Sequence, residues 1–422
     1  MIVKPKGTHD LYGEEVKYWQ YVSRVVDEVM ERYNYGFIRT PIFESTELFH
    51  RGVGDTTDIV SKETYDFVDR GERKMTLRPE GTAGVVRSFI ENKMYGDATQ
   101  PVKLYYNGTM YRYERPQSGR DRELTQFGVE VLGSSDPAID AEVISLAVNI
   151  FKLLGLKGVK VKINSLGDTE SRNNYREALI KYFKPHIKEL CEDCQERLEK
   201  NPLRILDCKV DADSDILKNA PVMLDYLNDD SKNRFEDVQN YLDVLDIDYE
   251  VDPRIVRGLD YYSHTVFEIE ATVKDFGANN VLAGGGRYDT MVSNLGGPET
   301  PGIGFACGLG RLVMALQLEE VKLPISNELD AFILYCADTE KEYAMALCQD
   351  LRLNGLKVET EYMGRGLKGQ FKQADRLNAK YLVILNDEDL VGGEMQVKDN
   401  HTKETTMVKE AEIDDYLDMN CR

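Results

Sequence analysis

The sequence lacks any long uncharged apolar run. No stretch approaches the roughly 18 apolar residues that can cross a bilayer, and Met1 to Gly7 has no apolar core of the signal-peptide kind. The seven cysteines are an odd number spread over 422 residues, which does not fit a disulfide framework and is typical of a reducing compartment. We therefore expect a cytoplasmic protein with no membrane contact.

Several common catalytic motifs are also missing. There is no Gly-x-x-x-x-Gly-Lys phosphate loop, and a dinucleotide fingerprint built on Gly302 and Gly304 fails because its third glycine would fall on Cys307. Neither a Gly-x-Ser-x-Gly nucleophile elbow nor a His-Glu-x-x-His metal helix occurs. If this chain handles ATP, we expect it to do so outside the common parallel-sheet folds.

Positive charge is scarce overall. The chain has 53 Lys and Arg against 74 Asp and Glu, a net charge of -21, which disfavours indiscriminate binding to polyanions. Two stretches are nevertheless basic: residues 103–122 carry a local charge of +3 and residues 362–380 one of +4, whereas 387–418 carry -8. This segregation suits phosphate contacts at chosen places, and solvated helix and loop faces are the alternative.

What is present divides into three parts. An amphipathic helix over 15–33 precedes segments that read mainly as antiparallel strands with helices alongside, so 1–170 plus 253–322 predict one discontinuous α+β domain. Residues 171–252 are charged and helical in period, which predicts a helical insertion. After a linker near 323–327, residues 328–422 alternate strands and helices, so we expect a small α/β domain with a largely parallel sheet.

Three local patterns lie in the first part. Residues 37–43 read as one strand whose Pro41 belongs at an edge or a bulge. Asn107-Gly108-Thr109 predicts a turn between two apolar runs. The polar stretch 115–122 predicts the basic tip of a long antiparallel hairpin.

Arginines stand at suggestive places beside strands and glycines. Arg112 shares a strand face with Glu114, and its planar fork suits bidentate phosphate binding; a solvated cross-strand ion pair is the alternative. Arg257 precedes a glycine at the start of a strand, and a turn before a buried strand is the alternative reading. Arg311 begins a helix after a glycine-rich strand, where it could bind an anion or merely lie on the helix surface. The run 284–286 of three glycines indicates either close approach of a ligand or backbone, or a tight turn.

Together these segments resemble the class II aminoacyl-tRNA synthetases, and among them the histidyl-tRNA synthetase family. Leu77 to Thr82 and Arg257 to Tyr262 resemble signatures of that family, and the resemblance spans nearly the whole chain. Gly36 to Phe43, Tyr111 to Gln126 and Gly302 to Arg311 resemble the three class II motifs. One departure is Gly310, which stands where the third motif usually has glutamate.

The resemblance implies a role for each matching position. It implies that Arg112, Arg257 and Arg311 are catalytic through phosphate contacts. It implies an ATP site of Arg112, Glu114, Arg120 and Arg311, and a histidine site of Glu80, Thr82, Gln126, Glu130, Arg257, Tyr261 and Tyr262. It also implies tRNA contacts by Arg115, Gln117, Arg122, Arg365, Lys368 and Lys372.

The implied activity is that of a histidine–tRNA ligase. L-Histidine and ATP would give histidyl-adenylate and pyrophosphate, and histidine would then pass to the 3′ end of tRNA(His). The resemblance implies Mg²⁺ with ATP as substrate, no tightly bound organic cofactor, a homodimer formed around Pro41, and an anticodon-binding role for 328–422. The alternatives are an inactive, synthetase-like regulatory subunit of histidine biosynthesis, and a different class II synthetase.

Three cysteines stand close together in the predicted insertion. Cys191-x-x-Cys194 and Cys208 suggest zinc, but structural zinc takes four ligands and His186 is the nearest further candidate. We therefore expect buried free thiols and no metal.

Overall fold

The computed structural model describes residues 1–54, 57–116, 119–206, 208, 210–255, 259, 261–277 and 280–421. They form two compact units, Met1–Leu323 and Pro324–Arg422, and each is described here by itself. The boundary coincides with the predicted linker. The finer division of the first unit, into 1–170 plus 253–322 and an insertion at 171–252, stays a prediction. Within the described chain, no helix is both long enough and apolar enough to cross a bilayer.

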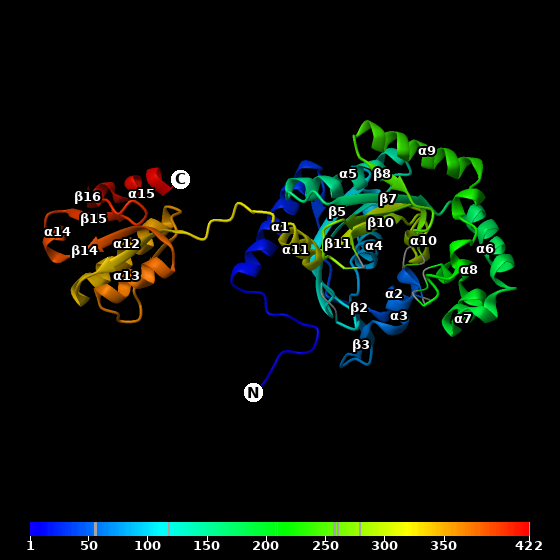
Figure 1. Ribbon diagram of the computed structural model, residues 1–422, viewed down its shortest axis with the longest axis horizontal. Helices are drawn as coiled ribbons and strands as arrows, with labels where there is room; N and C mark the ends of the chain where they lie inside the picture. The colour runs from blue at the N-terminus through cyan, green and yellow to red at the C-terminus, as the bar shows by residue number, and fades with distance from the viewer. Residues whose placement is uncertain are drawn as a thin grey trace. The chain divides into compact units, whose positions relative to one another are not determined.

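The first unit is built around an eight-stranded sheet (Figure 1). Its two end pairs, β1 with β5 and β8 with β7, are parallel, whereas the pairings between them are antiparallel, as predicted for an α+β fold. In spatial order the strands are β1 (Gly36–Phe37), β5 (Val102–Tyr111), β6 (Glu123–Leu132), β11 (Gly302–Gly308), β10 (Val281–Arg287), β9 (Ser263–Ala271), β7 (Val159–Ser165) and β8 (Tyr249–Val251).

Several helices bury their apolar faces in one core with this sheet. The predicted amphipathic helix is confirmed as α1 (Glu14–Arg32), which packs on α5 (Pro137–Leu153) and α11 (Leu309–Leu318). Their buried side chains join those of the strands in one hydrophobic core. A second core gathers around α2 (Thr46–Val53), α4 (Thr82–Glu91) and α10 (Met291–Asn294). The sheet segments between these cores are therefore held rigidly.

One buried ion pair joins α5 to the sheet. Arg287 Nε donates to Asp140 Oδ1 at 2.8 Å, both side chains are fully buried, and Thr265 Oγ1 donates to Asp140 Oδ2 at 2.7 Å. Arg287 also pairs with Asp289 at 3.0 Å, and Asp140 with Arg234 at 3.6 Å, so removing either charge would disrupt a buried ionic network and destabilise the fold. Arg287, within the glycine-rich segment noted in the sequence, is thus structural.

The predicted strand over 37–43 is wrong. Strand β1 ends at Phe37, and β2 (Phe43–Ser45) belongs to a separate sheet with β4 (Lys74–Leu77) and β3 (Tyr65–Val68). Pro41 lies in the gap, where it has no N–H to offer to a ladder. The side chain and backbone of Arg78 bond the flanking carbonyls, with Nη1 donating to Thr40 O at 3.0 Å and the backbone N to Ile42 O at 2.8 Å.

The predicted turn at Asn107-Gly108-Thr109 is also wrong. Strand β5 runs through it without interruption and pairs with β6 along its whole length, which confirms the hairpin itself. Gly108 serves a different purpose, because a Cβ there would lie 2.6 Å from Arg78 Nη2. The glycine makes room for a buried arginine rather than for a reversal of the chain.

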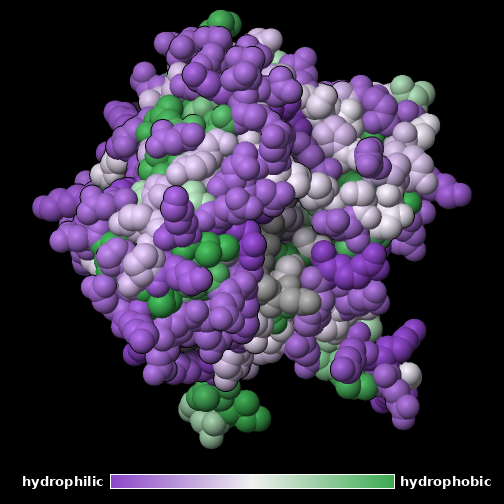
Figure 2. Space-filling view, turned by 90° about the vertical axis from the view of Figure 1, so that its right-hand side faces the viewer, coloured by the Kyte–Doolittle hydropathy of each residue, from purple (hydrophilic) through white to green (hydrophobic). Residues whose placement is uncertain are grey.

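Helices dominate residues 169–244. In Figure 1, α6, α7 and α8 lie at one side of the unit and α9 runs over α5. The face that they form is mostly hydrophilic, with separate apolar patches (Figure 2). The elements are α6 (Thr169–Phe183), η2 (Ile187–Glu189), α7 (Glu192–Lys200), η3 (Pro202–Ile205), α8 (Asp215–Lys218), η4 (Met223–Tyr226) and α9 (Asp229–Val244).

The second unit has a five-stranded mixed sheet in the order β13-β12-β14-β15-β16. The first three strands are parallel and the last two antiparallel, so the α/β prediction is confirmed but the sheet is parallel only in part. Its strands are β12 (Leu329–Tyr335), β13 (Val358–Thr360), β14 (Ala379–Leu385), β15 (Glu394–Asp399) and β16 (Thr405–Lys409), and its helices α12 (Lys341–Leu353), α13 (Leu367–Arg376), α14 (Asp387–Val391) and α15 (Ile413–Cys421).

Candidate active site

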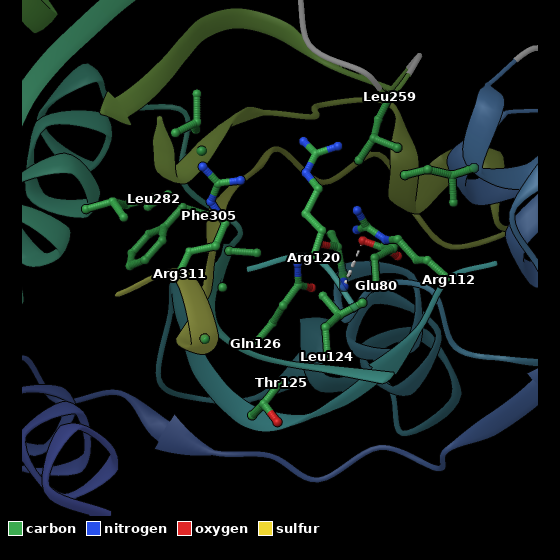
Figure 3. A pocket seen from close by; sticks show the side chains of 18 of the residues that line it. Glu80, Arg112, Arg120, Leu124, Thr125, Gln126, Leu259, Leu282, Phe305 and Arg311 are labelled. Atoms are coloured by element: carbon green, nitrogen blue, oxygen red, sulfur yellow. Dashed lines mark hydrogen bonds between the residues drawn. The ribbon is translucent and has the colours of Figure 1, made fainter. Parts of the chain in front are cut away.

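A cavity of about 560 Å³ opens on the sheet of the first unit. Its walls come from β6, β9, β10 and β11, from the end of the β5–β6 hairpin and from the start of α11. In Figure 3, Arg112 and Arg311 approach from opposite sides, with Arg120 and Gln126 between them. A concave site with a few convergent polar groups is the usual form of a small-molecule site.

Arg112, Arg120 and Arg311 are among the arginines that line this cavity. Arg112 follows the last residue of β5. Its Nε donates to Pro79 O at 2.8 Å, which fixes the orientation of its guanidinium group. Arg120 Nη1 lies 3.4 Å from Glu114 Oε2, and the Arg311 guanidinium lies 5.2 Å from the Phe276 ring centroid. Burial, and next the charge of Arg120, lower the pKa of Arg311. This concentration of positive charge suits a polyphosphate.

Glu114 shares the cavity wall with Arg112, as the strand-face argument predicted, although both follow β5 instead of lying within it. The alternative of a solvated cross-strand pair is wrong, because Glu114 pairs with Arg120 in the hairpin and Arg112 bonds a backbone carbonyl.

Buried carboxyl groups form another part of the wall. The carboxylate of Glu80 accepts from the backbone N of Thr82 at 3.1 Å and of Ala83 at 2.6 Å, at the start of α4. Thr82 Oγ1 donates to Glu130 Oε1 at 2.6 Å, and the Tyr288 hydroxyl donates to the other oxygen of Glu130. Glu130 is 1% exposed. The hydroxyl donors hold the carboxyl group of Glu130 in one orientation.

Burial raises the pKa of both carboxyl groups. The pKa of Glu80 is above its usual value, and that of Glu130 rises from 4.5 to about 8, because burial outweighs the bonds from Thr82 and Tyr288. Burial therefore favours the protonated form of Glu130 when no ligand is bound. A cationic ligand would favour its ionised form, so this residue can respond to what enters the cavity.

Glu130 should make the stability of the unliganded protein depend on pH. Its folded pKa exceeds the unfolded one, so the stabilising effect of the bound proton is complete below pH 4.5 and lost as pH rises towards 8. We expect urea unfolding midpoints to fall across this window more steeply for the wild type than for Glu130→Gln. Parallel profiles for the two proteins would contradict the raised pKa.

Aromatic and amide groups complete the same region. Tyr261 and Tyr262 are both buried, with ring centroids 4.6 Å apart, and both line the cavity. Gln126 lies on β6 opposite Gly108 and Gly308, and its Oε1 is buried with no donor among the described residues. A buried amide oxygen without a partner is costly, so a ligand donor there would relieve it.

The glycine run 284–286 lies inside β10, so the tight-turn alternative is wrong. A Cβ on Gly285 would lie 2.2 Å from Gly304 O, and one on Gly304 would lie 2.1 Å from Glu130 Oε2. Gly284 and Gly304 also line the cavity. These glycines let two strands and a carboxyl group meet where a side chain would fill the space.

Several cavity residues were not predicted from the sequence, among them Trp19, Arg204, Glu268 and Tyr288. Trp19 fits the apolar periodicity of α1, so the sequence indicated a core residue. Its Nε1 is buried with no acceptor in the described part of the chain. The indole ring also lies next to Gly310, which replaces the usual glutamate: a Cβ on Gly310 would lie 3.5 Å from the indole. Arg204 comes from η3 of the predicted insertion. None of the four carries a local motif.

Two predicted site residues, Arg257 and Gln117, lie outside the described residues. Of the other predicted tRNA contacts in the hairpin, Arg115 is exposed, whereas Arg122 is tied back. Arg122 Nε donates to Glu114 O at 3.1 Å, and its guanidinium lies 3.9 Å from the Tyr113 ring centroid.

The three predicted contacts in the second unit lie around the start of α13. Arg365 pairs with the buried Glu361 at 3.0 Å, while Lys368 and Lys372 are exposed one helical turn apart. Gly364 and Gly366 lie between β13 and α13, and Gly369 lies inside α13. The three have the spacing of a dinucleotide fingerprint, so the prediction that the chain lacks this motif is wrong. Backbone N–H groups at such a helix start favour phosphate.

Comparisons with known proteins identify the family of both units. Residues 7–312 match the family described as histidyl-tRNA synthetase, and 324–420 match the one described as anticodon binding domain. A histidine–tRNA ligase of Bacillus cytotoxicus is 57% identical over 95% of both chains.

Two solved structures are also similar. The apo histidyl-tRNA synthetase of S. aureus is 44% identical with a TM-score of 0.86, and covers 99% of this chain and 100% of that one. A Bacillus halodurans structure titled ATP phosphoribosyltransferase regulatory subunit/histidyl-tRNA synthetase is 21% identical with a TM-score of 0.63, and covers 91% of this chain and 98% of that one; it shows the fold alone. The chain belongs to the histidyl-tRNA synthetase family.

Proposed function

We propose that this chain activates histidine with ATP in the cavity of the first unit and then transfers histidine to the 3′ end of tRNA(His). The observation that carries the assignment of the site is the meeting of three guanidinium groups and a buried carboxyl–hydroxyl network in one cavity. The first group of residues suits a triphosphate and the second a small polar ligand. The activity places the protein in the cytoplasm, where translation uses charged tRNA.

In the activation step, a carboxylate oxygen of histidine attacks the α-phosphorus of ATP in line. The new P–O bond forms as the bond to the β-phosphate oxygen breaks, and pyrophosphate leaves. We assign Arg112 and Arg257 to the α-phosphate, Arg311 and Arg120 to the γ-phosphate end, and Glu114 to the adenine. Fixed guanidinium groups stabilise the crowded negative charge without a protein nucleophile.

Mg²⁺ would enter with the nucleotide and neutralise part of the phosphate charge. Carboxylate oxygens are ligands that Mg²⁺ prefers, and Glu268 lines the cavity, so its carboxylate together with the phosphate oxygens would supply a fitting donor set. The chain's own part is to hold these oxygens beside the arginines.

Histidine would occupy the region of Glu80, Thr82, Gln126, Glu130, Tyr261 and Tyr262. Its imidazole offers one donor and one acceptor, and its ammonium group offers further donors. Gln126 Oε1 and the Glu130 carboxyl group are acceptors already in place, and the bonds that Glu130 accepts from Thr82 and Tyr288 prevent it from turning away. An apolar amino acid would leave them unpaired, which gives strong discrimination.

In the transfer step, a ribose hydroxyl at the tRNA 3′ end attacks the carbonyl carbon of the adenylate, and AMP leaves. We propose that the hairpin tip, with Arg115, Gln117 and Arg122, faces the acceptor end. Arg365, Lys368 and Lys372 of the second unit would bind the phosphates near the anticodon.

The lysines of α13 provide a test of the tRNA assignment. We expect Lys368→Ala with Lys372→Ala to weaken tRNA binding roughly tenfold at low salt and to reduce the slope of log affinity against log salt by about one per lysine. Histidine-dependent pyrophosphate exchange should not change. Lys409→Ala, an exposed lysine of the same unit paired with Glu412, is the matched control. Equal losses in both variants would contradict the assignment.

We also propose a homodimer through the segment around Pro41. Phe37, Ile42 and Phe43 are 56%, 42% and 53% exposed, and Phe67 of the adjoining small sheet is 40% exposed. An apolar patch of this kind at a sheet edge is favourable to bury against a second copy.

Histidine-dependent exchange of labelled pyrophosphate into ATP by the purified protein tests the proposed function. We expect exchange with histidine and none with glutamine or phenylalanine. A folded protein that binds histidine but gives no exchange would support the inactive regulatory subunit. The second unit and the retained Arg112, Gln126, Glu130 and Arg311 favour the enzyme.

A further inference from the structure

We propose that Cys191, Cys194, Cys208 and Asp211 form a structural zinc site in the helical part of the first unit. Their three sulfurs and one carboxylate oxygen lie within 4.8 Å of one another. The four residues lie at two places in the chain. Cys191 caps the start of α7 and Cys194 lies in its first turn, while Cys208 and Asp211 follow η3.

The distances within the cluster fit one tetrahedral metal. Cys191 Sγ lies 3.6 Å from Cys208 Sγ, and Cys208 Sγ lies 3.5 Å from Asp211 Oδ2. A tetrahedron with metal–sulfur bonds of about 2.3 Å has sulfur–sulfur edges of about 3.8 Å, and its sulfur–oxygen edges are slightly shorter. The cluster therefore needs only small adjustments to close on an ion.

The backbone around the cluster supports the ligands. Asp211 N donates to Cys208 Sγ at 3.4 Å, and Asp211 Oδ2 accepts from Cys191 N at 3.0 Å. These contacts fix the two chain segments against each other and orient the carboxylate. Such supporting bonds are typical of metal sites in which the ligands are held in advance.

Asp211 supplies the ligand that sequence reasoning sought at His186. The His186 ring is instead only partly buried, and its Nδ1 lies 3.2 Å from Glu189 Oε1. The expectation of free thiols rested on having only three donors. With Asp211 the set has four, and three thiolates select a soft or borderline ion such as Zn²⁺ over Mg²⁺ or Ca²⁺. Four protein ligands leave no open position, so the role is structural.

The surrounding elements are short enough to benefit from a metal. Helix α8 has four residues, η3 and η4 have four each and η2 has three. Cys194 and Cys208 belong to the small hydrophobic cluster that these elements share. Small units with little core commonly rely on a metal or a disulfide for stability.

The proposed zinc site is also connected to the wall of the cavity. Arg204 lines the cavity from η3, four residues before Cys208, and its carbonyl accepts from Arg197 Nη1 of α7 at 3.3 Å. A metal that joins α7 to the segment after η3 would hold this wall in place. The zinc site itself does not depend on the proposed ligase activity.

Metal analysis of the full-length protein tests the site directly. We expect about one zinc per chain after growth in zinc-supplemented medium and gel filtration without chelator. Replacement by Co²⁺ should give the intense visible bands of a tetrahedral ion together with sulfur-to-cobalt charge transfer. Less than about one-tenth of a zinc per chain, with no cobalt spectrum, would overturn the proposal.

Matched variants separate zinc from other fates of the thiols. Cys194→Ser should lose the metal and lower Tm, and Asp211→Asn should weaken zinc binding roughly tenfold or more. Cys336→Ser, at an exposed cysteine of the second unit, should keep the zinc. Should the serine variant fail to fold, the wild-type cobalt spectrum still decides. A Cys191–Cys208 disulfide found by thiol titration and mass spectrometry, or metal retained by Cys194→Ser, would refute the site.

Discussion

Arg112→Ala should lower the kcat/KM of histidine-dependent pyrophosphate exchange by roughly 10²- to 10³-fold, the effect of removing one fixed donor from a developing negative charge. The guanidinium is held through its Nε by Pro79 O at 2.8 Å, so its remaining nitrogens are available to a phosphate without reorganisation. Because the α-phosphate gains charge in the transition state, the loss should fall mainly on kcat.

The control for this variant is an arginine remote from the cavity. Arg32 lies on α1, is 63% exposed and pairs only loosely with Glu28 at 3.7 Å. Arg32→Ala should leave the exchange rate unchanged. If Arg112→Ala instead raised the KM for ATP with kcat intact, Arg112 would contribute equally to ground-state and transition-state binding, and its catalytic assignment would be wrong.

Glu130→Gln should reduce kcat/KM for histidine by roughly 10- to 100-fold, corresponding to the loss of one hydrogen bond to a charged group. The substitution preserves shape but removes the charge that a cationic ligand would stabilise in Glu130. It also places an amide donor against two hydroxyl donors, Thr82 Oγ1 and the Tyr288 hydroxyl. The KM for ATP should change little, since the arginines are untouched.

Glu47→Gln, at an exposed carboxylate of α2, is the matched control for a charge-neutralising change. Calorimetric titration of histidine into both variants measures the binding step alone. Unaltered histidine affinity in Glu130→Gln would place the amino acid elsewhere in the cavity. Equal loss of histidine and ATP binding would instead indicate that the substitution disturbs the fold.

The elements that could be predicted are those in which the hydrophobic pattern and the local residue types indicate the same structure. The 3.6-residue period of α1, the β5–β6 hairpin and the alternating strands and helices of the second unit all follow from side chains close in sequence. Gly108 shows where such reasoning fails. Its purpose is set by Arg78, a residue 30 positions away that packs against it, so an Asn-Gly pair inside a strand looks like a turn.

The site divides in the same way. Arg112, Glu114, Glu80 and Gln126 could be assigned because they lie within or beside recognisable signatures, and the structure brings them to one cavity. Tyr288, Arg204 and Asp211 could not. Tyr288 and Asp211 bond to residues more than 15 positions away in the chain, and Arg204 reaches the cavity from a separate segment. No local sequence spacing identifies any of the three. Only the folded chain identifies their partners.

Trp19 gives the cavity an optical property. It is the only tryptophan in the chain, so the indole fluorescence of the protein originates at a single ring on the wall of this cavity. That ring is partly buried, faces Gly310 and carries an N–H without an acceptor among the described residues, so its emission should be sensitive to a nucleotide that arrives beside it. The chain therefore contains a built-in reporter, and stopped-flow emission can time the filling of the cavity separately from the bond changes that follow.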